Sequence, residues 1–141
     1  MSPIAMKKGF FIITLSVLCL LFLSDLSNGA EWVLVGKSQD GNTSVSIDKE
    51  SISQTYGDIV KSCQKFSYVK PIFLNNPRKP VSALIAYREW DCSGEKYNDL
   101  QVTFCYADGT KETETYKYAL WHYIKQGTSE GDLYDYVCNQ E

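Results

Sequence analysis

The chain has 141 residues, which is the length of one ordinary domain and excludes a large multidomain assembly. Its formal net charge of -3 argues against a nucleic-acid-binding protein, because such proteins usually present a basic surface. It contains 5 cysteines, an odd number that cannot be fully paired within the intact chain.

Residues 1–30 have the layout of a secretory signal peptide. Lys7 and Lys8 form a short positive region, an apolar run extends from Phe10 to Leu23, and small and polar residues follow. The run is shorter than the roughly 20 residues that span a bilayer, so an uncleaved membrane anchor is the less favoured interpretation. We expect cleavage after Gly29 or after Ala30, and the sequence does not distinguish these two positions.

Export explains the odd cysteine count. Cys19 lies inside the apolar run and follows Leu18, whereas lipoprotein processing requires a small residue at that place, so we expect Cys19 to be discarded and no lipid anchor to be present. Removing residues 1–30 takes away two lysines and one aspartate and leaves one domain, residues 31–141, with a net charge of -4. In a small exported domain an even set of cysteines predicts disulfides rather than metal ligands. The set is Cys63, Cys92, Cys105 and Cys138.

From residue 31 onward the pattern predicts about six antiparallel strands and one helix. Apolar alternation, bounded by turn residues, predicts strands at 32–35, 43–48, 59–69, 81–92, 97–106 and 110–118. Asp48 is expected to cap a single helical turn. Residues 71–80 contain three prolines and two asparagines, which predicts a loop.

The turn between the fourth and fifth strands sets the predicted register. If residues 93–95 form a three-residue turn, Cys92 faces Lys96 and a mostly apolar set falls on one face, which we expect to be buried. Cys105 then points to the opposite face. The set is Leu84, Ala86, Trp90, Cys92, Leu100, Val102 and Phe104.

Residues 129–138 are predicted to form the helix. Ser129 is the expected N-cap, and Asp132 follows three residues later in a position like that of a capping box. This helix is the one predicted element able to cover the apolar face of the sheet. Its apolar stripe is Leu133, Tyr136 and Val137.

The predicted fold class is therefore α+β, a twisted antiparallel sheet with a C-terminal helix packed on one face. A Cys92–Cys138 bridge would join helix and sheet, and it is favoured among the three pairings that four cysteines allow. By elimination Cys63 would pair with Cys105. In a simple meander a third strand separates these two, which puts their Cα atoms about 10 Å apart, too far for a disulfide. Either the strand order is not a simple meander or this pair is not bonded.

The sequence contains no apparent catalytic constellation, and we expect a non-enzymatic protein without a cofactor or metal. His122 is the single histidine, and we expect it to pack against an aromatic ring. Three acidic residues of the hairpin are expected to form ion pairs with Arg88 or Lys96 rather than to perform acid–base chemistry. They are Glu89, Asp91 and Asp99.

Tyrosine is unusually abundant, with 10 residues, and six aromatic side chains cluster just before and within the predicted helix. Such rings can fill the core of a small domain or form a surface that binds a partner protein. Core packing is favoured for Trp121 and Tyr136. The two interpretations are balanced for Tyr116, Tyr118 and Tyr134, which are the candidate partner-binding residues.

Several motifs, taken in order, resemble the bacterial surface-adhesin protein E family. They are Trp32-x-Leu34-Val35-Gly36, Ser46-Ile47-Asp48-x-x-Ser51-Ile52, Trp90-Asp91-Cys92, Trp121 and Leu133-Tyr134-x-x-Val137-Cys138. The resemblance covers nearly all of residues 31–141. It implies an antiparallel sheet whose concave face holds a C-terminal helix through a disulfide, which corresponds to Cys92 and Cys138. Cys63 and Cys105 are not part of the family pattern.

The resemblance also implies a function. The family is that of an adhesin of Gram-negative bacteria that binds host matrix and plasma proteins such as vitronectin, laminin and plasminogen, and that can form a homodimer. The alternative is a periplasmic structural or protein-interaction module of the same fold with no host ligand. Either function places the protein in the periplasm or at the outer membrane or cell surface. No short binding motif can be transferred, so the resemblance assigns no binding residue.

Overall fold

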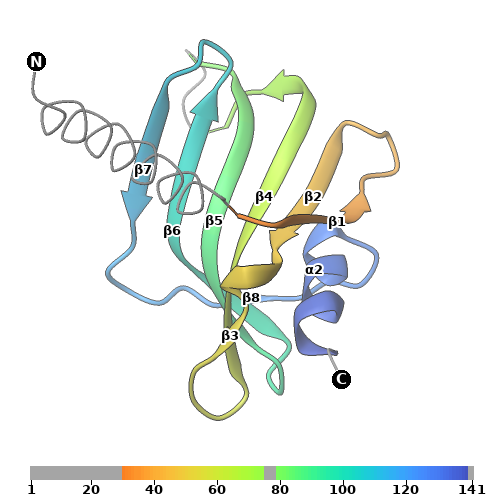
Figure 1. Cartoon of the computed structure of the whole chain (residues 1–141), viewed down its shortest axis with the longest axis vertical. Coiled ribbons are helices and arrows are strands. Elements are labelled where there is room, and N and C mark those ends of the chain that lie inside the picture. The colour runs from red at the N-terminus through yellow and green to blue at the C-terminus, as the bar shows by residue number, and fades with distance from the viewer. Residues whose placement is uncertain (1–29, 75–78, 140–141) are drawn as a thin grey trace, which may run out of the picture.

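The computed structural model describes residues 30–74 and 79–139, so nearly all of the predicted export segment lies outside the described residues. Within these residues eight strands form one antiparallel sheet in the order β1-β2-β4-β5-β6-β7, with β3 paired to β4 and β8 paired to β6 (Figure 1). The strands are β1 (Trp32–Lys37), β2 (Thr43–Asp48), β3 (Ser53–Gln54), β4 (Ile59–Ile72), β5 (Val81–Asp91), β6 (Lys96–Tyr106), β7 (Lys111–Thr115) and β8 (His122–Tyr123). A 3₁₀ turn, η1 (Lys49–Ser51), follows β2, and the helix α2 (Ser129–Cys138) ends the described chain.

The predicted fold class is confirmed. The six strands along the main path of the sheet correspond to the six predicted strands, and the helix lies at the predicted residues. The two additional strands, β3 and β8, have two residues each, which is too short to produce a periodic pattern in the sequence. Asp48 caps η1 as predicted, since its carboxylate accepts a hydrogen bond from the backbone N–H of Glu50.

Strand β4 runs further than predicted. It continues to Ile72 through Pro71, where the sequence predicts a loop. The register between β4 and β5 shifts between Ser67 and Ile72. A proline is compatible with a strand at such an irregularity, because the N–H that it lacks is not needed for the ladder there.

The predicted three-residue turn between β5 and β6 is wrong. Asp91 pairs with Lys96, so the turn has four residues, and Trp90 faces Tyr97. A bulge at Leu100 restores the predicted register further along β6, where Ala86 faces Val102 and Leu84 faces Phe104. The predicted buried face is therefore largely correct. Ala86, Trp90 and Val102 are in the core and Leu84 and Phe104 pack against it, whereas Leu100 and Cys92 are not among the core residues.

The hydrophobic core lies between the sheet and α2. The strands contribute Val45, Ile47, Phe66, Ala86, Trp90 and Val102, and the helix contributes Leu133, Tyr134 and Val137. The helix packs against β1, β2, β4 and β5. Its N-cap is Thr128 rather than the predicted Ser129, because the Thr128 hydroxyl accepts a hydrogen bond from the backbone N–H of Gly131.

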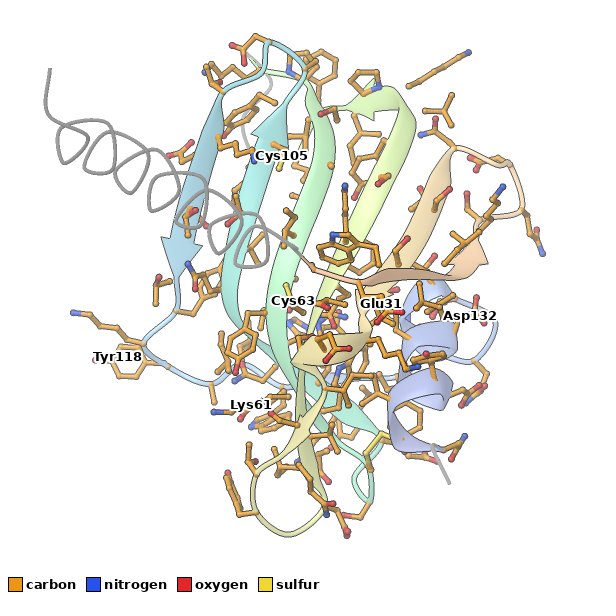
Figure 2. All side chains as sticks on the ribbon, viewed as in Figure 1. Glu31, Lys61, Cys63, Cys105, Tyr118 and Asp132 are labelled. Carbon is orange, nitrogen blue, oxygen red and sulfur yellow. A yellow bond between two sulfur atoms is a disulfide. The ribbon has the colours of Figure 1, made fainter. Side chains whose placement is uncertain are left out.

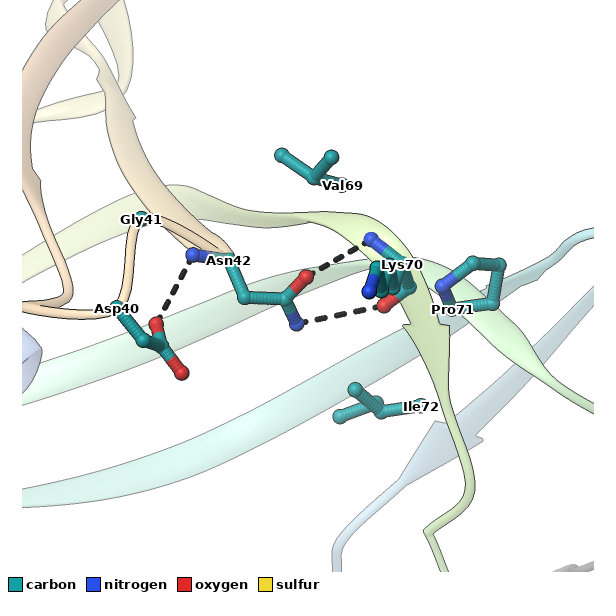
Figure 3. Close-up of a pocket in the computed structure, with 7 residues that line it drawn as sticks. All are labelled: Asp40, Gly41, Asn42, Val69, Lys70, Pro71 and Ile72. Carbon is teal, nitrogen blue, oxygen red and sulfur yellow. Dashed lines mark hydrogen bonds between the residues drawn. The ribbon is translucent and has the colours of Figure 1, made fainter.

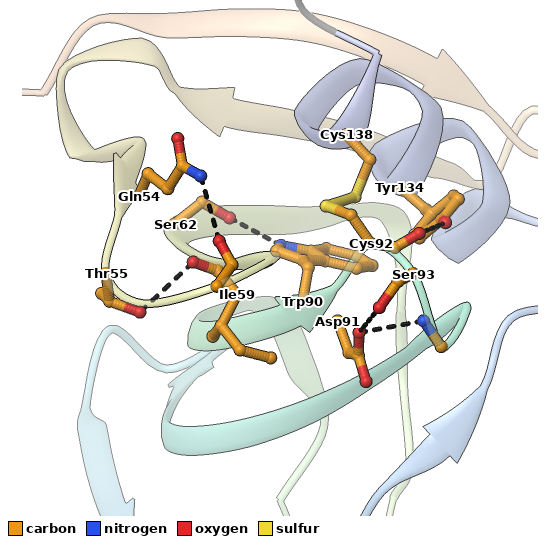
Figure 4. Close-up of a disulfide and its surroundings, with 12 residues drawn as sticks. Gln54, Thr55, Ile59, Ser62, Trp90, Asp91, Cys92, Ser93, Tyr134 and Cys138 are labelled. Carbon is orange, nitrogen blue, oxygen red and sulfur yellow. Dashed lines mark hydrogen bonds between the residues drawn. A yellow bond between two sulfur atoms is a disulfide. The ribbon is translucent and has the colours of Figure 1, made fainter.

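A disulfide joins Cys92, just beyond β5, to Cys138 at the end of α2 (Figure 4). The two Cα atoms are 5.5 Å apart, a separation that a disulfide spans without backbone movement. Tyr134 on the same helix donates a hydrogen bond from its hydroxyl to the carbonyl of Cys92. The disulfide and this hydrogen bond therefore fix the helix to the end of β5. The cysteine pairing favoured by the sequence analysis, Cys92 with Cys138, is present.

The second predicted bridge is wrong, because Cys63 and Cys105 are free thiols. Strand β5 separates them: Cys63 lies opposite Tyr87 and Cys105 lies opposite Ala83. Four residues along the strand and two strand spacings correspond to about 13 Å and about 10 Å, so the sulfur atoms cannot meet. Figure 2 shows the two cysteines well apart on the sheet.

Peptide mapping of the processed chain without reduction is expected to give one linked pair, Cys92 with Cys138, and two alkylated cysteines, Cys63 and Cys105. Burial and the nearby Asp48 carboxylate raise the pKa of the Cys63 thiol. Since the thiolate is the reacting species, Cys63 is expected to be alkylated more slowly in the folded chain than after denaturation. Recovery of a peptide linking Cys63 to Cys105 would contradict the strand order.

Candidate functional site

The segment that joins β7 to β8 carries a group of exposed, mostly aromatic side chains. We call Tyr116, Tyr118, Leu120 and Tyr123 the tyrosine surface. Tyr118 is the most exposed of them, with 86% of its surface accessible, and Figure 2 shows it pointing away from the sheet. Four large side chains that face solvent in one short segment are more than scattered surface apolar residues, and such patches mark interaction sites.

The backbone beneath this surface is held against β6 at several points. Strands β7 and β8 lie on the same side of β6, one after the other, and the segment between them passes over Asn98 and Leu100. The backbone N–H of Tyr116 donates to the carbonyl of Leu100 at 3.0 Å. The N–H of Leu120 donates to the side-chain oxygen of Asn98 at 2.9 Å. The tyrosine surface is thus an ordered part of the sheet edge.

A hollow of about 180 Å³ lies within the tyrosine surface. Its polar groups are largely committed: Asn98 donates to Glu89, and Asp99 accepts from Arg88 at 2.7 Å. Partial burial, followed by the hydrogen bond that its hydroxyl donates to Glu114, raises the pKa of Tyr116. The hollow therefore has a mainly apolar lining. It is lined by Asn98, Asp99, Tyr116, Tyr118, Leu120 and His122.

The single histidine packs as predicted. The imidazole of His122 stacks on the ring of Tyr97, with centroids 5.1 Å apart and planes 29° from parallel. The next aromatic residue, Trp121, is only partly buried and lies beneath the ammonium group of Lys96 at 5.2 Å. The sequence favoured a core position for Trp121, and the side chain is only partly buried.

Two of the three hairpin carboxylates form the predicted ion pairs, and the prediction is wrong for Glu89. Asp99 pairs with Arg88, and Asp91 lies 3.9 Å from Lys96. Hydrogen bonds from Gly94 and Ser93 lower the pKa of Asp91. Glu89 accepts from Asn98, so its contact is a hydrogen bond rather than an ion pair. These groups serve to build the hairpin.

Arg88 is buried beside this hairpin, with its guanidinium 3.9 Å from the centroid of the Tyr97 ring. The rings of Trp90 and Phe66 lie 5.0 and 5.6 Å from it. Three ring faces and the Asp99 carboxylate therefore compensate the buried charge. This packing holds Asp99 in place at the floor of the hollow.

Of the three candidate partner-binding residues, Tyr116 and Tyr118 lie on the tyrosine surface. Tyr134 does not, because it is buried in the core between α2 and the sheet. Leu120 and Tyr123 complete the surface and were not among the candidates. Both could have been included from the sequence, because they lie in the same aromatic-rich segment as Tyr116 and Tyr118.

A family model for surface-adhesin protein E matches residues 32–139, which include the disulfide and the whole tyrosine surface. The chain belongs to the surface-adhesin protein E family. A search of curated proteins gives no significant match.

Two solved structures of family members share the fold. The structure of Haemophilus influenzae protein E has a TM-score of 0.51 and 16% identity, covering 77% of this chain and 83% of that one. Protein E from non-typeable Haemophilus influenzae has a TM-score of 0.53 and 14% identity, covering 79% of each chain. At this identity the likeness shows the fold alone.

A second hollow of this family member, of about 490 Å³, lies between the β1–β2 turn and the end of β4 (Figure 3). Its polar groups close the turn. The Asn42 side chain accepts from the N–H of Lys70 at 2.8 Å and donates to its carbonyl at 3.3 Å. Asp40 accepts from Ser38 and from the N–H of Asn42, and these bonds lower the pKa of Asp40. We interpret this hollow as a structural feature of the turn.

Within residues 30–74 and 79–139 of this adhesin-family chain, no helix is long and apolar enough to cross a bilayer. The same residues include no group of three or more His, Cys, Asp or Glu side chains placed to hold a metal ion.

Asn98→Ala is expected to release the tyrosine surface from β6. The substitution removes the acceptor for the Leu120 N–H and the donor to Glu89, which should lower the free energy of unfolding by about 1–2 kcal/mol. Hydrogen exchange of the Leu120 amide should accelerate. The matched control is Gln101→Ala on the same strand, whose side chain is exposed and whose loss should change stability by less than about 0.5 kcal/mol. Unchanged exchange at Leu120 would contradict the anchoring role of Asn98.

Proposed function

We propose that this protein is an exported, non-enzymatic binding protein of the cell envelope that holds a partner protein on its tyrosine surface. The observation that carries this proposal is the exposure of Tyr118 and its neighbours on a backbone already fixed to β6. Tyrosine is enriched at protein interfaces because its ring is large and its hydroxyl tolerates water. Membership of the adhesin family supports a role in attachment.

The ordered backbone is relevant to affinity. Binding usually costs entropy when loops and side chains become ordered at the interface. The hydrogen bonds from Tyr116 and Leu120 to β6, and the pairing of β8, already order this segment in the free chain. A partner therefore gains contact with the rings without ordering the loop. This is the arrangement that makes rigid aromatic residues effective binding groups.

By resemblance to the family, the proposed partners are host matrix and plasma proteins, namely vitronectin, laminin or plasminogen. The proposed location is the outside of the cell envelope, reached through the export segment at residues 1–30 and without a lipid anchor. A homodimer could display two such surfaces at once. The net charge of -3 for the whole chain agrees with a protein partner rather than nucleic acid.

Two measurements test this proposal. The processed chain, purified after export, is expected to bind at least one of these three proteins when it is immobilised at physiological salt. Intact cells are expected to expose the protein to added antibody. Release with the periplasmic fraction, together with no binding to any of the three, would instead support the periplasmic interaction module.

A further inference from the structure

In the described part of the chain the two edges of the sheet differ. Strand β1 has a bulge between Leu34 and Gly36, and α2 packs against it so closely that a Cβ on Gly36 would lie 2.6 Å from a carboxylate oxygen of Asp132. Strand β7, at the opposite edge in Figure 1, has an unbroken register with β6, and all five of its residues are exposed. A regular, uncovered edge strand is a template for another strand.

The hydrogen bonds at the two ends of β7 show which of its backbone groups are free. The N–H of Tyr106 donates to the carbonyl of Thr110, and the N–H of Tyr116 donates to that of Leu100. In an antiparallel pair this direction alternates from residue to residue, so the even-numbered residues of β7 face β6. The N–H and C=O groups that point outward are therefore those of Lys111, Thr113 and Thr115.

The side chains of β7 also alternate between two faces. Glu112 lies opposite Phe104 and Glu114 lies opposite Val102, so both carboxylates are on the face that holds the core and α2. Thr113 is on the other face, where its hydroxyl is 2.9 Å from that of Thr103. An added strand would meet Glu112 and Glu114 on one face and Lys111, Thr113 and Thr115 on the other.

Both glutamates are oriented by hydrogen bonds, and no cation among the described residues pairs with them. Glu112 accepts from the hydroxyl of Tyr106 at 2.7 Å, and Glu114 accepts from that of Tyr116 at 3.0 Å. The bond to Glu112 is the main cause of the raised pKa of Tyr106. None of the ion pairs formed by the described residues involves either glutamate. The edge thus offers two negative charges, two residues apart.

We propose that β7 is the docking edge for an extended segment of a protein partner, which adds to the sheet as an antiparallel strand and places Lys or Arg beside Glu112 and Glu114. The inference rests on the proposed partner-binding function and specifies its mode of recognition. The tyrosine surface follows β7 directly on the same side of β6. The partner's extended segment would therefore run from the edge of β7 onto the aromatic rings. Alternating basic residues on an extended chain are the sequence signature of this partner.

The test uses the processed chain and a capped peptide, Thr-Val-Lys-Thr-Lys-Val-Thr. With its central threonine opposite Thr113, the two lysines lie opposite Glu112 and Glu114. Binding is expected to slow hydrogen exchange at the amides of Lys111, Thr113 and Thr115. A peptide with glutamate in place of both lysines is expected to bind about three- to tenfold more weakly, and the double variant Glu112→Lys/Glu114→Lys should reverse that preference.

Backbone methylation separates strand addition from simple charge attraction. In the antiparallel register the central threonine and the two valines of the peptide donate their N–H groups to β7, whereas the lysine N–H groups point away. N-methylation of the threonine and valines is expected to abolish binding, and N-methylation of the lysines should leave it largely intact. Equal effects of both methylations, or the reverse pattern, would overturn the proposal.

Three further outcomes are decisive. If the amides of Lys111, Thr113 and Thr115 are already protected in the free chain and the chain is dimeric, a second copy occupies the edge and the proposal is wrong. If host proteins bind through the tyrosine surface but no peptide shows the methylation pattern, strand addition fails while the proposed function stands. If the peptide binds in the expected pattern but no host protein binds, the proposed function fails and the docking edge stands.

Discussion

Replacing Trp90 with alanine is expected to lower the free energy of unfolding by about 3–5 kcal/mol. The indole is 0% exposed and packs against the rings of Tyr97 and Tyr134, with centroids 5.6 and 6.4 Å away. Its N–H donates to the hydroxyl of Ser62 at 2.8 Å (Figure 4). That hydroxyl in turn donates to the side-chain oxygen of Gln64. The substitution opens a cavity and also breaks a chain of buried hydrogen bonds.

Equilibrium unfolding in guanidinium chloride measures this loss. Domains of this size are stable by about 5–15 kcal/mol, so the variant should unfold at much lower denaturant concentration. The matched control is Trp32→Ala, which removes a tryptophan that is 37% exposed and has a cation–π contact with Lys65. Its expected cost is about 1 kcal/mol or less. Similar losses at both positions would contradict the central role of Trp90.

Removing the disulfide with Cys92→Ser/Cys138→Ser is expected to destabilise the chain by about 4 kcal/mol, given the 46-residue separation that the bond closes. A helix of 10 residues is not stable alone, so α2 depends on its attachment to the sheet. Hydrogen exchange should rise most in α2. The core contacts of Leu133 and Val137 remain available, which means that the helix should loosen rather than detach.

The control for this pair is Cys63→Ala/Cys105→Ala, which leaves the disulfide intact. Both of these thiols are only half-buried and form no bridge, so the expected change is below about 1 kcal/mol. Guanidinium unfolding of the two double variants side by side gives the comparison. A larger loss in the control than in the disulfide variant would mean that the bridge does not hold the fold together.

Much of the sheet follows from local patterns. Alternation in β2 and turn residues between the strands predict six strands, and Asp48 caps its turn as its side chain suggests. The pairing of Cys92 with Cys138 was predicted from a register that contained two errors. The four-residue turn and the bulge at Leu100 compensate each other, because each shifts the register by one residue. A bulge of this kind has no reliable signal in a single sequence.

The candidate site was only partly predictable. Tyr116 and Tyr118 are exposed, as the partner-binding interpretation requires, whereas Tyr134 is buried in the core. Its burial depends on a hydrogen bond to the carbonyl of Cys92, 42 residues away in the chain, and on the packing of α2 across the sheet. Contacts between segments that are distant in the sequence therefore determine whether such a tyrosine is buried or exposed. The anchoring of Leu120 by Asn98 is equally invisible to local pattern.

The central claim, that the tyrosine surface carries partner binding, is tested most directly with two exposed tyrosines. Tyr118 on that surface and Tyr56 in the β3–β4 turn are 86% and 69% exposed. Binding of the processed chain, Tyr118→Ala and Tyr56→Ala to immobilised vitronectin, laminin and plasminogen should be measured in parallel. We expect the processed chain and Tyr56→Ala to bind equally, and Tyr118→Ala to bind about tenfold more weakly. Equal binding by all three forms, or no binding by any of them, would contradict the claim.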